Sequence, residues 1–308
     1  MTQANSTTTK TMVVVVGPTG IGKTGVGIEL AKTFHSVIIS ADSRQIYREI
    51  PIGTAAPTPQ QMEEVLHLMV GTHSVFDYYN AYEFEQDALA LSERIFLEKD
   101  IVFMVGGSMM YIDAFCNGID DLPNVDPQVR NELMQKLEQE GLESIRRQLK
   151  QLDPDFYNQV DLKNPKRVIH AVEICIMTGK PYSQLRTQPK KKRSFRIIKI
   201  GLDMDRQQLY ERINNRVIQM MDHGLKQEAE QLLAYQHLNA LNTVGFKELF
   251  GCFNGEHSLD KAIELIQRNS RHYAKKQLSW FRRDREINWF LPSQTIAMTE
   301  LIKKELLL

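Results

Sequence analysis

A glycine-rich segment of eight residues limits what this chain can fold into more than any other feature. Residues 17–24 read Gly-Pro-Thr-Gly-Ile-Gly-Lys-Thr, follow an apolar run and open a helical stretch. This is the phosphate-loop pattern, in which backbone N–H groups and a helix N-terminus surround an anion. We expect Lys23 to add a full positive charge and Thr24 to ligate a Mg²⁺ ion that bridges two phosphate groups. The residues predicted to bind a diphosphate or nucleotide are Gly17, Pro18, Thr19, Gly20, Ile21, Gly22, Lys23 and Thr24.

The segments around this loop predict an α/β fold. Short apolar runs at residues 12–16, 37–40 and 101–105 have the composition of strands that are buried on both faces. Helical periodicity at residues 23–34 and 84–98 separates them. Because strands that alternate with helices usually pair in parallel, we expect a P-loop NTPase-like parallel sheet covered by helices.

The pattern becomes helical after Asn117. Asp126 is a predicted N-cap and Pro127 a predicted first helical residue, and helices follow to about residue 178. A strand pattern returns at residues 196–202, and helices are expected from Asp205 to His223 and from residue 259 to about 283. We therefore predict a core in two parts with a helical carboxy-terminal region, interrupted by an inserted helical domain. The predicted boundaries are 1–120 and 196–308 for the core and 121–195 for the insertion.

Composition narrows the cellular setting and the class of partner. The 308 residues carry zero formal net charge, three widely separated cysteines and no apolar run long enough to span a bilayer. We expect a cytoplasmic protein with no membrane partner, and a monomer. Zero net charge argues weakly against nucleic acid, but the charge is uneven: residues 190–193 form a basic run, and residues 268–285 hold seven Lys or Arg against one acid.

Asp42 is a candidate catalytic residue because it follows the second predicted strand. Ligands of open α/β sheets gather beyond the carboxyl ends of the strands, so its carboxylate should face the glycine-rich loop. It could hold Mg²⁺ or act as a general base, and a role as a turn or helix cap fits the spacing equally well. The third predicted strand ends at residues 105–108, Val-Gly-Gly-Ser, without the carboxylate that many P-loop ATPases place there.

Six segments in order resemble a known family over nearly the whole chain. These segments are the loop, residues 42–47 (Asp-Ser-Arg-Gln-Ile-Tyr), 52–55 (Ile-Gly-Thr-Ala), 105–108, 245–249 (Gly-Phe-Lys-Glu-Leu) and 273–282 (Tyr-Ala-Lys-Lys-Gln-Leu-Ser-Trp-Phe-Arg). Together they are similar to bacterial tRNA dimethylallyltransferases, the IPP transferase family. The resemblance implies transfer of a dimethylallyl group from its diphosphate to N6 of the adenosine immediately 3′ of the anticodon. The partners would be dimethylallyl diphosphate and the tRNA anticodon stem-loop.

The resemblance also implies roles for individual residues. The loop would hold a diphosphate leaving group, which needs no hydrolytic carboxylate, and Thr24 would help bind Mg²⁺. Asp42 would be the base that takes a proton from the adenine amine, and Arg216 would neutralise charge that develops on the diphosphate. The residues implied to contact tRNA are Asp42, Ser43, Arg44, Gln45, Ser108, Arg130, Lys166, Arg167, His170, Gly245, Phe246, Lys247, Lys275, Lys276, Gln277, Trp280 and Arg282.

The chain departs from the family pattern at single RNA-contact positions. Ala56, Ser108, Lys166 and His170 stand where the family usually has lysine, threonine, glutamine and arginine. Taken alone, Trp280 fits a core aromatic better than a stacking platform, and Arg216 fits a solvated helix arginine.

Three other functions share the loop and stay open at this point. They are a small-molecule phosphotransferase of the nucleoside or shikimate kinase type, a prenyltransferase acting on free adenine nucleotides, and an NTP-dependent RNA-binding module.

Overall fold

The computed structural model describes residues 9–120, 122–186 and 191–307. The polar segment before residue 9 and Lys190 of the basic run lie outside these residues. The chain forms two compact units. One is built from residues before 117 and after 191, and the other from residues 117–191. We call them the core unit and the helical unit and describe each by itself.

A parallel sheet organises the core unit. Within the described residues it has six strands in the order β3-β2-β4-β1-β5-β6. Every neighbouring pair is parallel, with β1 central between β4 and β5. The strands are β1 (Thr11–Val16), β2 (Ile38–Ala41), β3 (His67–Leu68), β4 (Ile101–Gly106), β5 (Arg196–Leu202) and β6 (Ile287–Phe290). The predicted α/β class with a parallel sheet is confirmed.

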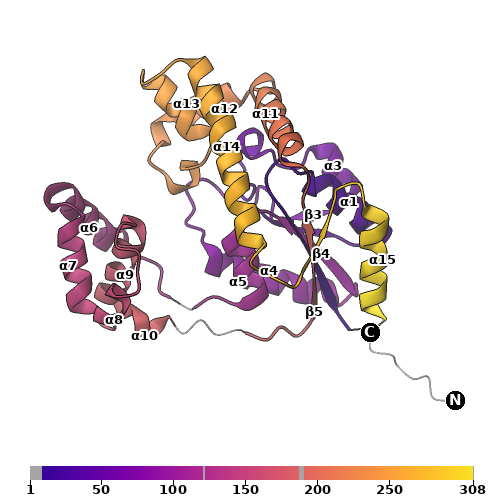
Figure 1. Cartoon of the computed structure of the whole chain (residues 1–308), viewed down its shortest axis with the longest axis horizontal. Helices are drawn as coiled ribbons and strands as arrows, with labels where there is room; N and C mark the ends of the chain where they lie inside the picture. Colours follow the sequence, from indigo (N-terminus) through magenta and orange to yellow (C-terminus); the bar gives the residue numbers. More distant parts are fainter. Residues whose placement is uncertain (1–8, 121, 187–190, 308) are drawn as a thin grey trace. The chain divides into compact units, whose positions relative to one another are not determined.

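Helices cover both faces of the sheet (Figure 1). The side chains of β1 are apolar on both faces and alternate between two hydrophobic clusters. Met12, Val14 and Val16 pack in one cluster, while Val13 and Val15 pack in the other. The helices of this unit are α1 (Lys23–Thr33), α2 (Pro51–Thr54), α3 (Pro59–Glu64), α4 (Ala81–Phe96), α5 (Met109–Asn117), α11 (Arg206–Asp222), α12 (Leu225–Gln231), α13 (Phe246–Phe253), α14 (Leu259–Phe281) and α15 (Thr295–Leu306).

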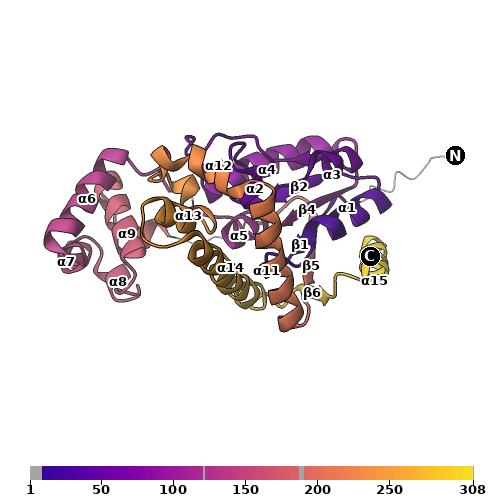
Figure 2. The ribbon, with the colours of Figure 1, turned by 90° about the horizontal axis from the view of Figure 1, so that it is seen from above.

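Helices α4, α5 and α13 contribute side chains to the first cluster, and helices α1, α11 and α15 contribute side chains to the second. Helices α11 and α14 run beside one another at the carboxyl edge of the sheet (Figure 2). They are joined where Arg271 Nη1 donates to Asn214 Oδ1 over 2.6 Å. Helix α14 also contacts the glycine-rich loop, where the N–H of Thr19 donates to Gln277 over 2.8 Å.

The helical unit has its own small core. Its helices are α6 (Pro127–Glu140), α7 (Leu142–Leu152), α8 (Pro154–Tyr157), α9 (Pro165–Thr178) and α10 (Tyr182–Leu185). Asp126 caps α6 by accepting from the N–H of Gln128, with Pro127 as the first helical residue, as predicted. Ile145, Leu149 and Val168 are completely buried between α7 and α9.

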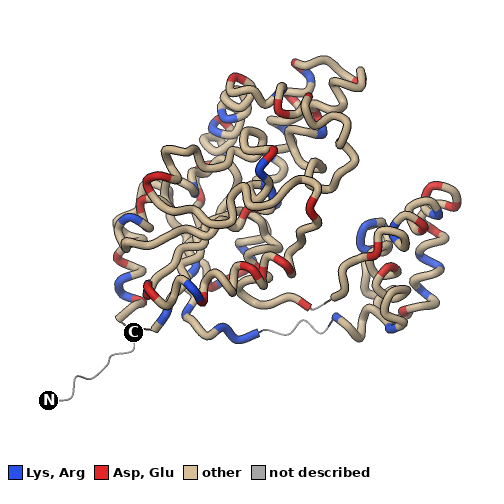
Figure 3. Tube along the Cα trace, turned by 180° about the vertical axis from the view of Figure 1, so that it is seen from behind, with Lys and Arg blue, Asp and Glu red and all other residues tan. Residues whose placement is uncertain are grey.

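Charged residues are interspersed along both units rather than gathered in one of them (Figure 3). Arg193 of the basic run is structural: it donates to Glu85 Oε1 over 2.7 Å and to the carbonyl oxygens of Phe115 and Ala114. Among the described residues, no helix has the length and apolar character needed to cross a membrane.

Candidate active site

The glycine-rich loop joins β1 to α1 in a conformation that glycine permits. Gly20 and Gly22 have φ of 80° and 102°, in the left-handed region. A Cβ on Gly20 would lie 2.7 Å from Cγ1 of Ile213, so α11 packs directly on the loop. A side chain at position 20 would therefore clash with Ile213 of α11.

Lys23 lies in the loop with its ammonium group turned inward. Its Nζ donates to the carbonyl oxygen of Pro18 over 2.9 Å. Burial lowers the pKa of Lys23 to about 8, although the negative charge of Asp42 opposes this shift. A bound anion would favour the charged form, so Lys23 is suited to hold a diphosphate.

Two cavities meet at the carboxyl edge of the sheet. The first, about 580 Å³, is lined by Gly20, Gly22, Lys23 and Thr24 and by the α2–α3 segment; we call it the loop cavity. The second, about 470 Å³, is lined by Arg44, Lys247, His272 and Lys276; we call it the basic cavity. The residues that line both cavities are Thr19, Asp42, Thr54, Arg216, Met220 and Tyr273. A group in either cavity can therefore lie against Asp42 and Arg216.

Asp42 has the surroundings of both roles predicted from the sequence, a turn cap and a functional carboxylate. Its Oδ1 accepts from the backbone N–H of Arg44 at 3.0 Å and of Gln45 at 3.4 Å, which is a turn cap. The same side chain lines both cavities. The cap contacts fix the orientation of the carboxylate at the junction.

Arg216 approaches the junction from α11. Its Nη2 donates to the carbonyl oxygen of Thr54 over 3.4 Å. Burial lowers the pKa of Arg216, and Asp42 raises it. The guanidinium is thus a partly buried cation beside a carboxylate, not a solvated helix arginine.

The other residues predicted around Asp42 form its supporting network. Ser108 is buried, and its Oγ accepts from the N–H of Ser43 over 2.7 Å. Gln45 accepts from the hydroxyl of Ser40 at 3.1 Å and donates to the carbonyl oxygen of Ala55 at 3.1 Å. Ser43 and Arg44 line the basic cavity.

The predicted residues of α13 and α14 divide into exposed and buried groups. Lys247, Lys275, Lys276 and Arg282 are exposed, and Lys247 and Lys276 line the basic cavity. Gly245 is buried at the start of α13. Phe246 is completely buried and Gln277 is 2% exposed, so neither side chain presents the surface expected for an RNA contact.

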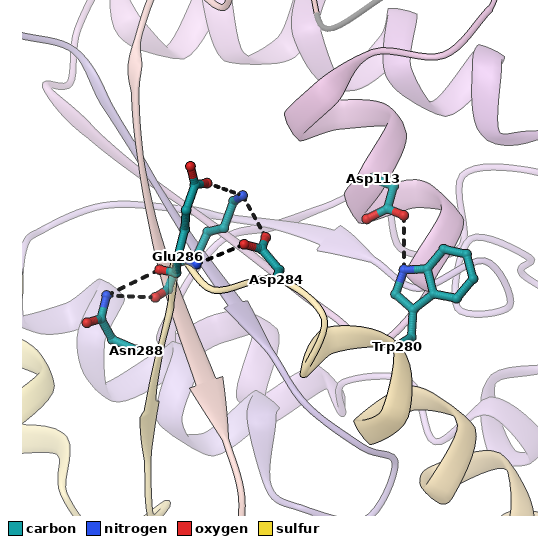
Figure 4. A network of polar contacts seen from close by, with 6 residues as sticks. Asp113, Trp280, Asp284, Glu286 and Asn288 are labelled. Atoms are coloured by element: carbon teal, nitrogen blue, oxygen red, sulfur yellow. Dashed lines mark hydrogen bonds and ion pairs between the residues drawn. The ribbon is translucent and has the colours of Figure 1, made fainter. Parts of the chain in front are cut away.

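Trp280 is half-buried. Its Nε1 donates to Oδ2 of Asp113 on α5 over 2.9 Å, and the two side chains point toward one another in Figure 4. The ring packs against the core, as the core-aromatic interpretation predicts. Beyond Trp280, buried Lys199 of β5 pairs with Asp284 and Glu286, both at 2.7 Å (Figure 4). Arg282 pairs with Asp203.

Four predicted RNA contacts lie in the helical unit. Lys166 and Arg167 are exposed near the start of α9. Arg130 donates to both carboxylate oxygens of Glu173, at 2.7 and 2.8 Å, and His170 Nδ1 lies 3.5 Å from the same carboxylate. Burial alone would raise the pKa of Glu173, but hydrogen bonds from Arg130 and His170 lower it to about 2.

Tyr273 is a site residue that the sequence alone did not single out for a role. It lines both cavities, and burial, followed by the charge of Asp42, raises its pKa to about 12. Its position four residues before Gln277, on the face of α14 that meets the loop, is the signal that could have indicated it.

The oxygen ligands at the loop suit Mg²⁺ only in combination with a substrate. Among the described residues no group of three or more His, Cys, Asp or Glu side chains could hold a metal ion. Mg²⁺ commonly takes one or two protein ligands and completes its shell with phosphate oxygens and water. Thr24 and Asp42, which both line the loop cavity, fit that pattern.

Comparison with known proteins shows which family this chain resembles. The family model described as IPP transferase matches residues 45–284. The chain is 55% identical to tRNA dimethylallyltransferase 1 of Bacteroides thetaiotaomicron, over 95% of each chain. It is also 55% identical to tRNA dimethylallyltransferase 2 of Parabacteroides distasonis, over 96% of this chain and 99% of the relative.

Solved structures agree with the sequence relatives. The tRNA isopentenylpyrophosphate transferase of Bacillus halodurans superposes with a TM-score of 0.71 and 32% identity, covering 96% of this chain and 97% of that one. A eukaryotic dimethylallyltransferase acting on tRNA superposes with a TM-score of 0.74 and 26% identity, over 92% of this chain and 74% of that one. The chain therefore belongs to the IPP transferase family.

Proposed function

We propose that this transferase moves a dimethylallyl group from dimethylallyl diphosphate to N6 of the adenosine immediately 3′ of the anticodon in tRNA, releasing diphosphate. The observation that carries the proposal is the meeting of two cavities at Asp42 and Arg216. One cavity contains the phosphate-type loop, and the lining of the other includes Arg44, Lys247 and Lys276. A donor and a nucleic-acid acceptor can then approach the same carboxylate from different sides.

The loop cavity is the proposed donor site. Lys23 and the loop N–H groups would face a diphosphate, and Thr24 would help hold Mg²⁺, which would neutralise part of the diphosphate charge. Apolar side chains line the same cavity and offer a surface for the prenyl tail; they are Ile52, Ala55, Ala56, Pro57, Val105 and Met220.

The chemical step follows from the placement of Asp42 and Arg216. The N6 lone pair forms a bond to C1 of the dimethylallyl group as the C1–O bond breaks, and the bonding electrons leave with the diphosphate. Asp42 accepts the proton from N6, which makes a poor amine nucleophile effective. Arg216 stabilises the negative charge that grows on the leaving oxygen.

The basic cavity is the proposed acceptor site. The target base must leave its stack in the anticodon loop to reach Asp42, which costs a few kcal/mol. Lys247 and Lys276 supply positive charge at this cavity. We propose that Phe246, Gln277 and Trp280 act indirectly, by holding α13 and α14, while Lys166 and Arg167 offer the helical unit's exposed cations to RNA.

Competition between acceptors tests the proposal. With labelled dimethylallyl diphosphate, label should enter tRNA and not AMP or ATP. Label in the free nucleotide alone would favour the adenine-nucleotide prenyltransferase. Transfer of phosphate from labelled ATP to small acceptors would favour the kinase, and RNA-stimulated ATP turnover without modification of the RNA would favour the RNA-binding module.

A further inference from the structure

We propose that Glu228, outside both cavities, is a positioning residue that acts through the single turn of α2, where it sets Arg216 for the chemical step and orients Gln45. The inference rests on the proposed function. Nothing in the sequence of α12 singles this glutamate out, because a second glutamate, Glu230, lies two positions further along the same helix.

Glu228 holds the beginning of α2 through two hydrogen bonds. Its Oε2 accepts from the N–H of Ile52 at 2.8 Å, and its Oε1 accepts from the N–H of Gly53 at 2.7 Å. The side chain is 8% exposed, so water does not readily replace either contact. Each carboxylate oxygen therefore satisfies one helix N-terminal donor.

The end of the same turn holds two residues of the proposed active site. The carbonyl oxygen of Thr54 accepts from Arg216 Nη2 and from Gln45 Nε2, both at 3.4 Å. The carbonyl oxygen of Ala55 accepts from Gln45 at 3.1 Å. Because α2 spans only Pro51–Thr54, movement at its start is passed directly to these carbonyl groups.

Close packing keeps α2 against Glu228. A Cβ on Gly53 would lie 2.4 Å from the ring of Phe246 and 3.1 Å from Oε1 of Glu228. Phe246 thus closes one side of the turn while Glu228 fixes its N–H groups. This contact also gives a physical reason for the burial of Phe246 in a segment predicted to face RNA.

Glu228→Gln is the direct test, because it keeps the size of the side chain and removes one acceptor. The amide NH₂ would face a backbone N–H, so α2 must shift. At saturating donor and tRNA, the single-turnover rate constant should fall by about 10- to 100-fold, the range expected for misplaced catalytic groups. The matched control is Glu230→Gln, an exposed glutamate on the same helix, which should stay within about twofold of the parent.

A double-mutant cycle distinguishes positioning from general destabilisation. If Glu228 acts mainly through Arg216, then Glu228→Gln should cost less than about threefold in an Arg216→Ala background. A general loss of folded structure would lower the rate by the same factor in both backgrounds. Glu228→Asp retains two carboxylate oxygens and should recover part of the rate; it replaces Glu228→Gln in the cycle if the glutamine variant does not fold.

The outcomes separate this inference from the proposed function. A large loss in the parent background that nearly disappears without Arg216 supports it. Equal losses in both backgrounds, or a Glu228→Gln rate within twofold of the parent while the parent modifies tRNA normally, overturn the role of Glu228 alone. A parent that transfers no prenyl group to tRNA overturns the proposed function.

Discussion

Gln277 on α14 accepts a hydrogen bond from the backbone N–H of Thr19 in the glycine-rich loop over 2.8 Å, although the two residues are 258 positions apart. Its Nε2 donates to the carbonyl oxygen of Gly107, also at 2.8 Å. One buried amide therefore joins α14 to the loop and to the segment after β4. The donor site depends on the packing of α14.

Replacing Gln277 should weaken donor binding and the fold together. Gln277→Leu leaves the N–H of Thr19 and the carbonyl of Gly107 without partners, and each unsatisfied buried group costs about 1–3 kcal/mol. We expect a lower free energy of unfolding and a higher inhibition constant for pyrophosphate. Denaturant unfolding and inhibition assays check this. An unchanged inhibition constant would show that Gln277 does not shape the loop.

Donor affinity should fall at alkaline pH because of Lys23. Its pKa is lowered to about 8, and the diphosphate binds the charged form. Above pH 8 the free protein loses this proton, so binding must take it up again, and the pyrophosphate inhibition constant should rise toward about tenfold per pH unit. Lys23→Arg stays charged and should lack this rise, which also controls for ionisation of pyrophosphate. The same pH dependence in both proteins would assign it to another group.

Lys23→Ala tests the donor assignment without reference to pH. It should impair prenyl transfer while tRNA affinity stays nearly unchanged, since Lys23 lines the loop cavity and does not line the basic cavity. Titration with an anticodon stem-loop gives the affinity, and single-turnover assays give the rate. Failure of pyrophosphate to compete with the prenyl donor in the parent would remove the diphosphate from this loop.

Acid should loosen the helical unit through Glu173. The folded pKa is about 2, below the ordinary value of 4.5, so the carboxylate stabilises the fold above pH 4.5 and this contribution is lost as the pH falls toward 2. Glu173→Gln should therefore speed amide hydrogen exchange in α6 and α9 at neutral pH. The difference from the parent should shrink below pH 4. A difference that is constant with pH would mean that the ionised carboxylate is not responsible.

Much of the core could be predicted because its signals are local. The apolar run of β1, the loop and the start of α1 lie next to one another in the sequence, and the Asp205 cap of α11 forms with Gln207 and Gln208. The edge strands β3 and β6 were not predicted. Both are short, and β6 includes Asn288 and exposed or half-buried positions, so pairing with β5 defines it more than its own pattern does.

The sequence allowed the main site residues to be named, but it did not predict their burial or their long-range contacts. Asp42 and the loop were named from local sequence patterns and Arg216 from the family resemblance, and the structure places Asp42 and Arg216 at one junction. The burial of Gln277 and Phe246 depends on partners far away in the sequence, which no motif describes. Whether an Asp after a strand is a cap or a functional group could not be decided from spacing, because Asp42 has both kinds of surroundings.

Substitution of Lys275 and Lys276 tests tRNA binding separately from the chemical step. If α14 contacts phosphates, replacing both by alanine should weaken tRNA binding and flatten its salt dependence by about one unit of slope per lost contact. The single-turnover rate at saturating tRNA should stay near the parent value. Lys303→Ala with Lys304→Ala on α15 removes the same charge from exposed positions away from the cavities and is the matched control. Identical affinities and slopes for the two double variants would leave α14 out of the RNA site.

The most direct measurement is mass spectrometry of tRNA nucleosides after incubation with dimethylallyl diphosphate, for the parent and for Asp42→Asn. The account predicts that the parent adds one dimethylallyl group to the adenosine immediately 3′ of the anticodon. Asp42→Asn, similar in shape but unable to take the proton, should form the same product about 10²–10⁴-fold more slowly in a single turnover. Asp222→Asn, an exposed charge change on α11, should match the parent. No dimethylallyl adenosine from the parent, or an Asp42→Asn rate equal to the parent's, would contradict the account.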